Sequence, residues 1–401
     1  MKKKSLSKSI PLLSTQLMET YSATFDTSFF EQHPIAWNAK TERFIIYRAT
    51  SCKLYWFNVV FVLMIINGGF TVIILTKEVI SDLNSAWIRI CFPLLGCVMG
   101  ALFSFVLNIS YNALEATNLV DNLIRLERRI LHDSSSDIKE STPRYNNLIL
   151  TLKLQGRMFT PLGFVIAGLG VYFNMCPHGF LLEQWHGPYL MNHDWIRWIA
   201  RFLSYVAMVI ASVEHGQMTS IFTAILTTIV FSWERIANLT SQFPIQSAAQ
   251  FENVVRNYRQ LHLTEKIGRD FVMQVVFGTL STISTVLSGF IYITIKLYGK
   301  MPMKVYPLAP YICFVTLFLT YFLLRGIEGV NNRCAKGLAS LKMCRTRRSL
   351  EKRVATSVPV FAIPCGMRGY EMFKIEDGYR LGFYAMVLDN TWNLLLSFPN
   401  V

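Results

Sequence analysis

Long apolar stretches alternate with polar segments along most of the chain. A helix that crosses a lipid bilayer needs about 20 mostly apolar residues, and seven stretches reach or exceed about this length. The sequence therefore predicts an all-α membrane protein with seven transmembrane helices. The seven stretches are 55–76, 87–110, 159–175, 198–233, 271–295, 308–324 and 381–398.

Several segments outside these stretches also carry helical patterns. The fourth stretch, 198–233, is too long for one crossing and should continue out of the membrane as one helix. Apolar residues recur at helical spacing in 112–132 and 251–267, which predicts amphipathic helices. These pieces indicate a helical bundle on the cytoplasmic side. The apolar segment 354–365 has only twelve residues and two prolines, so we expect it to be buried or interfacial.

The distribution of Lys and Arg residues predicts the orientation of the seven spans. Segments 1–54, 111–157, 234–269 and 326–380 hold 8, 7, 5 and 11 of these residues, whereas the three segments on the opposite side hold 5 in all. Cytoplasmic loops of membrane proteins collect Lys and Arg. The N-terminus is therefore expected in the cytoplasm and the C-terminus outside the cell.

Composition supports the membrane prediction and excludes some functions. The chain is 52% hydrophobic and only 16% charged, whereas soluble domains average about a quarter charged residues. Its net charge of +14 comes from cations between apolar blocks, which favours a lipid bilayer over nucleic acid as partner. The eight cysteines are scattered, and the topology leaves Cys176 as the one clearly extracellular thiol, so no external disulfide framework is expected.

Two stretches resemble a known family of receptors. The segment 258–267 (YRQLHLTEKI) leads straight into the fifth predicted span. The chain stops soon after the seventh predicted span, an apolar helix interrupted by a few polar residues. In the arthropod gustatory and odorant receptor superfamily, the last helix ends with Thr-Tyr, five apolar residues and Gln-Phe. Here Thr391, Trp392 and Phe398 resemble that motif, although the spacing is one residue short and the Gln is absent. The chain is most similar to the gustatory-receptor-like branch.

This resemblance implies a homo- or heterotetrameric channel in the plasma membrane that is gated by a small-molecule tastant or odorant. It implies that monovalent and divalent cations pass through a central pore lined by the last helix of each subunit. The chain then divides into a cytoplasmic segment 1–54, helices with an outer ligand pocket in 55–325, a cytoplasmic linker in 326–380 and the pore helix in 381–401. The identity of the ligand and any need for a co-receptor stay open.

Polar residues in the last helix mark the expected pore. Asp389, Asn390 and Asn393 interrupt this apolar stretch, and polar groups within lipid usually face a cavity or a polar partner. Leu394 and Leu395, with the neighbouring Leu396, form an apolar stretch able to gate by dewetting. Ser397 completes the expected pore set. The alternative is a peripheral helix whose polar residues pair with neighbouring helices.

Aromatic residues near the outer ends of the spans are candidates for the ligand pocket. Small-molecule pockets are mostly apolar and aromatic, but aromatic residues also form a belt at the membrane interface. We favour the pocket for Phe202 and Tyr205, which lie three residues apart on one helix. The full candidate set is Tyr172, Phe202, Tyr205, Tyr292 and Tyr311.

The sequence gives little support for a titrating pair within the membrane, a metal site or a catalytic site. Glu214 and His215 are expected to make an inter-helix contact near the inner boundary, and the spacing of potential ligands in 176–194 matches no metal site. No catalytic motif is present, so neither an enzyme nor a cofactor is expected. Two alternatives to the channel stay open, a secondary transporter and a non-conducting receptor subunit.

Overall fold

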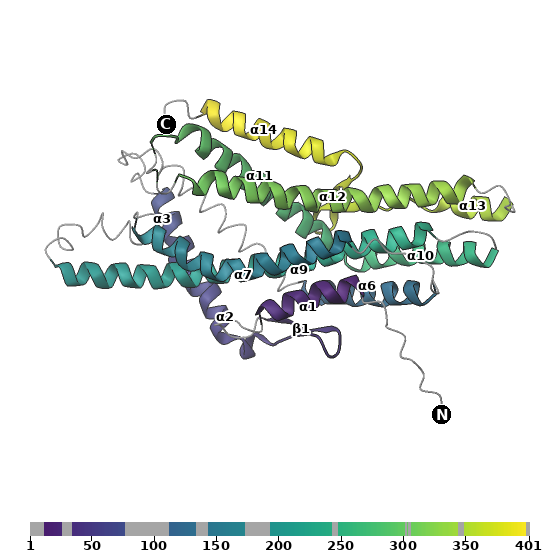
Figure 1. Ribbon diagram of the computed structural model, residues 1–401, viewed down its shortest axis with the longest axis horizontal. Coiled ribbons are helices and arrows are strands. Elements are labelled where there is room, and N and C mark those ends of the chain that lie inside the picture. Colours follow the sequence, from purple (N-terminus) through teal and green to yellow (C-terminus); the bar gives the residue numbers. More distant parts are fainter. Residues whose placement is uncertain are drawn as a thin grey trace.

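The computed structural model is elongated and mostly helical, with most of its helices running along the long axis (Figure 1). α9 is at the centre and contacts α1, α6, α7, α10 and α12, while α11 lies between α12 and α14. The residues that the structure describes are 12–25, 34–76, 112–133, 143–172, 193–242, 248–300, 303, 306–343 and 349–397.

The helices agree closely with the periodic patterns of the sequence. Those outside the first predicted span are α1 (Leu13–Phe25), α6 (Ala113–Asp133), α7 (Pro143–Tyr172), α9 (Asp194–Gln242), α10 (Ala248–Ile267), α11 (Arg269–Lys296), α12 (Leu308–Met343), α13 (Ser349–Ser357) and α14 (Tyr379–Ser397). The first span consists of α2 (Lys53–Phe57), the π-helical η2 (Asn58–Gly69) and α3 (Phe70–Thr76), preceded by the short η1 (Ala49–Ser51).

Four helical segments are long and apolar enough to cross a membrane: Lys53–Ile73, Asp194–Glu214, Arg269–Lys296 and Leu308–Met343. They coincide with the first, fourth, fifth and sixth predicted spans. The second predicted span, 87–110, lies outside the described residues. The third is represented by a shorter apolar helix, Gly163–Tyr172, within α7. The last predicted span forms α14 but is not among the four.

The two longest helices extend well beyond a bilayer. α9 has 49 residues, or about 74 Å at 1.5 Å per residue, whereas the hydrocarbon core is about 30 Å thick. The prediction of one continuous fourth helix is confirmed. α12 has 36 residues and continues into the segment that the sequence assigned to a linker. The first span crosses α9 steeply instead of running alongside it (Figure 1).

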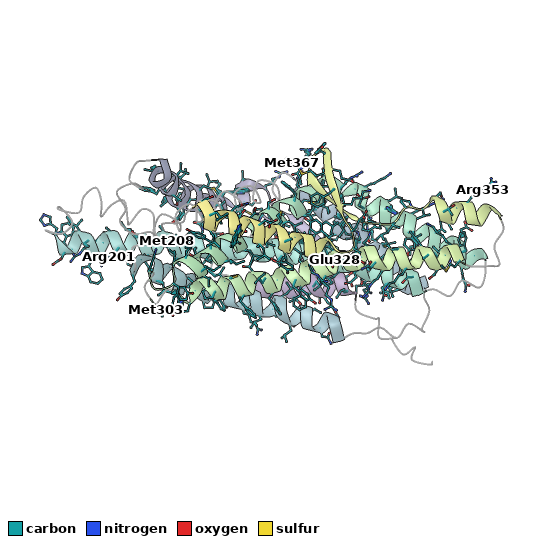
Figure 2. All side chains as sticks on the ribbon, turned by 90° about the horizontal axis from the view of Figure 1, so that it is seen from above. Arg201, Met208, Met303, Glu328, Arg353 and Met367 are labelled. Atoms are coloured by element: carbon teal, nitrogen blue, oxygen red, sulfur yellow. The ribbon has the colours of Figure 1, made fainter. Side chains whose placement is uncertain are left out.

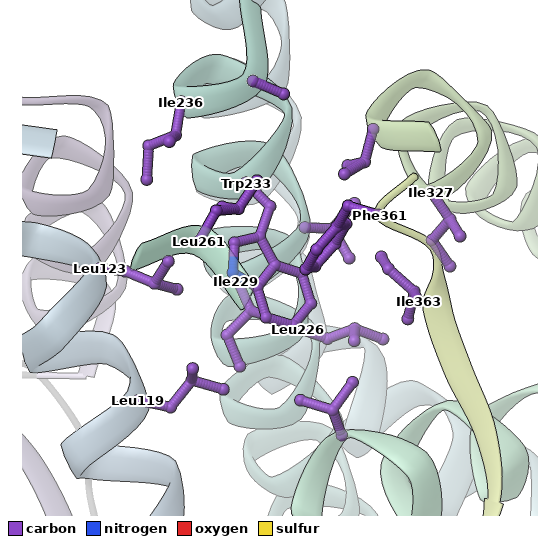
Figure 3. Close-up of a cluster of buried hydrophobic side chains, with 14 of the residues drawn as sticks. Leu119, Leu123, Leu226, Ile229, Trp233, Ile236, Leu261, Ile327, Phe361 and Ile363 are labelled. Carbon is purple, nitrogen blue, oxygen red and sulfur yellow. The ribbon is translucent and has the colours of Figure 1, made fainter. Parts of the chain in front are cut away.

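The main hydrophobic core lies in the bundle formed by α6, α10 and the later parts of α9 and α12. At its centre the rings of Trp233 and Phe361 meet edge to face with centroids 5.2 Å apart (Figure 3). Phe361 belongs to the apolar segment 354–365, which was expected to be buried or interfacial; Phe361 is buried, whereas Val360 beside it is 42% exposed, so the segment is buried in part. By contrast, only 22% of the Asp194–Glu214 segment is buried within the chain. Its exposed apolar surface needs lipid or another subunit to cover it.

Two small hairpins correct the expectation of an all-α chain. β1 (Ile35–Asn38) pairs antiparallel with β2 (Arg43–Ile46), and β3 (Ile363–Met367) with β4 (Tyr370–Ile375). The second hairpin turns at Gly369, whose φ of +73° favours glycine. A bulge at Gly366 brings backbone so close that a Cβ there would lie 2.2 Å from the Tyr370 carbonyl oxygen. These short strands sit among helices and lack a long alternating pattern.

Candidate functional site

The last helix, α14, packs against α11 through one face. Phe383, Val387 and Thr391 are buried and follow one another at intervals of four residues. The Ser288 hydroxyl on α11 donates a hydrogen bond to the Val387 carbonyl oxygen at 3.1 Å. This contact sets the rotation of α14 about its own axis, and hence which of its residues face outward.

The opposite face of α14 carries a polar stripe. Asp389, Asn393 and Leu396 are all exposed, and their spacing of four and three residues puts them on one side of a helix with 3.6 residues per turn. Leu396 has 62% of its surface exposed and lies at the far end of the stripe. The stripe therefore combines a carboxylate, an amide and an apolar side chain within two turns.

The rest of the expected pore set points elsewhere. The Asn390 amide donates to the Ser284 hydroxyl on α11 at 3.3 Å, so it pairs with a neighbouring helix. Leu394 and Leu395 are half-buried, and Ser397 is exposed but lies off the stripe. The structure thus separates a set that the sequence treated as one group. The sequence alone does not say which face of α14 is covered by α11.

The base of α14 is attached to α12 by Glu328. Its Oε1 accepts a hydrogen bond from the Arg380 backbone N–H at 2.8 Å, and its Oε2 lies 3.7 Å from the Arg380 Nε. The Arg380 guanidinium lies 5.1 Å from the centroid of the Tyr321 ring, within reach of a cation–π contact. Figure 2 shows Glu328 near the middle of the long axis, where α14 begins.

The β3–β4 hairpin joins the base of α14 to the junction of α10 and α11. Glu371 on β4 forms ion pairs with Arg269 at the start of α11 and with Lys374, the latter at 3.8 Å. The Phe373 ring stacks on Tyr379, the first residue of α14, with centroids 5.3 Å apart. The hairpin therefore holds the chain just before α14 against the bundle.

Two more ion pairs inside the bundle connect α12 to α9 and α9 to α6, further from α14. Glu234 on α9 pairs with Arg333 on α12 at 3.1 Å, and the adjacent Arg235 pairs with Glu127 on α6. Both glutamates are fully buried. Glu127 also accepts the Leu13 backbone N–H at 2.8 Å and the Ser14 hydroxyl at 2.5 Å, which anchors the start of α1.

We call Glu127–Arg235, Glu234–Arg333 and Glu328–Arg380 the ion-pair series. It connects α6, α9, α12 and α14 in order, and sequence reasoning missed it. The sequence signal that could have indicated buried ion pairs was the presence of charged residues next to apolar helical runs, as at Glu234 and Arg235. Their partners lie about a hundred residues away, so the pattern alone could not pair them.

Burial shifts the titration of several groups in the bundle. The Nε2–H of the His262 ring donates a hydrogen bond to the Pro359 carbonyl oxygen, 3.1 Å away, because a carbonyl oxygen can only accept. Burial lowers the His262 pKa, with Lys374 and Lys266 acting in the same direction and the Pro359 bond opposing them. Burial also raises the pKa of the Cys365 thiol to about 12, which leaves it protonated and inert.

The five expected pocket residues differ in their surroundings. Tyr292 is buried in α11, and Tyr205 on α9 is half-buried against α7, where its ring would lie 3.8 Å from a Cβ at Gly168. The other three are largely exposed in the single chain: Tyr172, Phe202 and Tyr311. Among the candidates that are not fully buried, Tyr205 is therefore the best placed between two helices, α9 and α7.

The other candidates from the sequence have simpler roles. The Glu214 carboxylate is buried and accepts a hydrogen bond from the Asn58 side chain at 2.9 Å, so the expected inter-helix contact is confirmed for Glu214. The side chain of His215 and residues 176–192 lie outside the described part. Within the described ranges no cluster of His, Cys, Asp or Glu residues has the arrangement of a metal site.

Comparison of the chain with models of known protein families and with curated proteins finds no match.

Proposed function

We propose that the protein is a chemosensory receptor that acts as a ligand-gated, non-selective cation channel, with four subunits around a central pore. The observation that carries this proposal is the polar stripe of Asp389, Asn393 and Leu396 on α14. α11 covers the opposite face, so the stripe is free to face a shared axis. Unsatisfied polar groups in lipid cost several kcal/mol each, by rough estimate, and facing water removes that cost.

The proposed topology has seven spans in the plasma membrane, with a cytoplasmic N-terminus and an extracellular C-terminus. The four long apolar segments support the membrane location, and the excess of Lys and Arg in alternate segments supports the orientation. The bundle that contains the ion-pair series then lies in the cytoplasm. The outer half of α9, with Tyr205, contributes to the ligand pocket.

The stripe gives each residue a role in conduction. Four copies of Asp389 would form a ring of carboxylates that favours cations, and four copies of Leu396 would form an apolar constriction that closes by dewetting. A small molecule bound near Tyr205 would shift the equilibrium toward the open state by binding it more tightly than the closed state. The altered C-terminal motif favours a non-conducting subunit as the second candidate, and the exposed Asp389 favours the channel.

Paired substitutions on α14 test the pore. Asp389→Asn removes the carboxylate at almost constant volume, so we expect a several-fold lower permeability to Ca²⁺ relative to Na⁺. Leu396→Ala should raise ligand-independent current at least about threefold, by weakening the apolar constriction. Leu388→Ala is the matched control, because Leu388 is equally exposed but lies off the stripe. Whole-cell recordings at equal surface expression measure both effects.

Accessibility to water provides an independent check. Cysteine introduced at 389, 393 or 396 should react with a water-soluble thiol reagent when the ligand is present. If these cysteines stay unreactive, and currents of Asp389→Asn and Leu396→Ala match wild type in a well-expressed protein, α14 does not line a pore.

A further inference from the structure

The start of α14 has an unusual capping arrangement. Tyr379 is its first residue, so the Arg380 backbone N–H belongs to the first turn, whose donors have no partner within the helix. Glu328, a carboxylate on another helix, accepts this N–H with one oxygen and pairs with the Arg380 guanidinium through the other. Glu328 is only 6% exposed. One side chain therefore holds both the backbone and the side chain of the first turn.

Glu328 is itself held in place by the rest of the ion-pair series. Five residues further along α12, Arg333 pairs with the buried Glu234 on α9. The neighbouring Arg235 connects α9 to Glu127 on α6. Separating a buried charge from its partner is strongly unfavourable, so each helix resists sliding against the next. The base of α14 is consequently fixed to the whole cytoplasmic bundle.

The far end of α14 has no such attachment among the described residues. The buried positions of the helix end at Thr391, and residues 392–397 are exposed or half-buried. The stripe residues Asn393 and Leu396 lie in this less covered part. α14 is therefore attached most firmly at its first turn and least at the end that carries the proposed constriction.

We infer that Glu328 is a positioning residue of α14: it fixes the first turn of the helix to α12, so that α14 moves by pivoting its far end about that turn. The pivot during gating rests on the proposed channel function, whereas the attachment of the first turn does not. The two parts can therefore be tested separately.

Hydrogen exchange of the full-length protein in lipid nanodiscs tests the attachment. Glu328→Ala removes the acceptor of the Arg380 N–H, so exchange in the first turn of α14 should become at least about tenfold faster, because local opening becomes easier. Glu328→Gln keeps an acceptor oxygen and should stay within about threefold of wild type. Glu376→Gln is the matched control, an exposed glutamate just before α14, and should leave exchange unchanged.

Arg380→Gln covers the case in which Glu328→Ala does not fold. It keeps the backbone N–H but removes the guanidinium of a side chain that is 35% exposed, and should accelerate first-turn exchange by an intermediate factor. Unchanged first-turn exchange in the folded Glu328→Ala protein, or in Arg380→Gln where Glu328→Ala does not fold, would overturn the attachment.

Ligand-free current tests the pivot. A released first turn should raise this current at least about threefold in Glu328→Ala at equal surface expression, with recovery toward wild type in Glu328→Gln. Faster exchange with wild-type gating in Glu328→Ala would overturn the pivot and keep the attachment. If the wild-type protein conducts no current with any ligand, the channel proposal and the pivot both fail, and the exchange result still decides the role of Glu328.

Discussion

Replacing Arg235 by methionine removes one partner of the most deeply buried ion pair in the described bundle. The side chains of Arg235 and Glu127 are 4% and 0% exposed. Methionine replaces the apolar stem of arginine but lacks the guanidinium, so the substitution leaves the Glu127 carboxylate inside the bundle without its cation. The backbone N–H of Leu13 and the Ser14 hydroxyl still donate to that carboxylate.

The expected loss of stability follows from these contacts. Removing one partner of a buried ion pair typically costs about 3–5 kcal/mol. Because the hydrogen bonds from Leu13 and Ser14 remain, we expect the lower end, about 3 kcal/mol, or roughly a hundredfold in the folded-to-unfolded ratio. The double substitution Glu127→Gln with Arg235→Met removes both charges but keeps an acceptor for α1. It should recover most of the loss, to within about 1 kcal/mol of wild type.

Denaturant unfolding of the detergent-solubilised protein, followed by tryptophan fluorescence, measures these differences. Trp233 is fully buried at the centre of the core, so its environment changes when the bundle opens. Arg128→Met is the matched control, because Arg128 pairs with Glu42 at the surface with 57% of its side chain exposed; its cost should stay below about 1 kcal/mol. The reasoning fails if Arg235→Met is as stable as Arg128→Met, or if the double variant is no more stable than the single one.

Two further predictions concern pH and the ligand. Because the pKa of His262 is lower in the folded protein than in the unfolded chain, the unfolded chain binds more protons in acid; the bundle should lose stability as the pH falls below about 6.5, the unfolded value. Unfolding between pH 7.5 and pH 5 measures this loss, and an equally steep loss in His262→Gln would contradict it. Tyr205→Ala should raise the half-maximal agonist concentration at least about tenfold, because the Tyr205 ring faces α7 in the proposed pocket. A tenfold change corresponds to roughly 1.4 kcal/mol of binding free energy. The exposed Phe202 provides the comparison, and a larger shift in Phe202→Ala would move the pocket to the outside of α9.

Most helices could be predicted from the sequence because their signals are local. The apolar and amphipathic runs that became α6, α9, α10 and α11 each repeat one helical period over many residues. The hairpin of β3 and β4 could not be predicted in this way, because each strand is short and the turn depends on one glycine with positive φ. The orientation and the number of spans stay predictions.

The candidate site shows a different limit. The polar residues of α14 were evident from the sequence, but their division into a free stripe and a packed face depends on α11, which contacts α14 from about a hundred residues earlier. The ion-pair series has the same character. A buried glutamate looks unfavourable when read alone, and only the fold supplies the arginine that makes its burial tolerable.

The positions of the buried charges bear on how α14 relates to a membrane. Glu214 on α9 and Glu328 on α12 each lie 20 residues after the first residue of their helix, or about 30 Å, which is the thickness of a hydrocarbon core. Both carboxylates are paired with groups on other helices. Through Glu328, the first turn of α14 is held beside the part of α9 near Glu234, because the adjacent Gly329 on α12 lies against the Glu234 side chain.

From its attached first turn, α14 extends 17 residues from Arg380 to Ser397, or about 26 Å, alongside α11. This length nearly matches one crossing, although the helix is less apolar than the four long segments. A helix of this length and polarity would be poorly suited to contact lipid all around. It is well suited to a position where one face packs on α11 and the face with Asp389 meets water, which is what a pore helix requires.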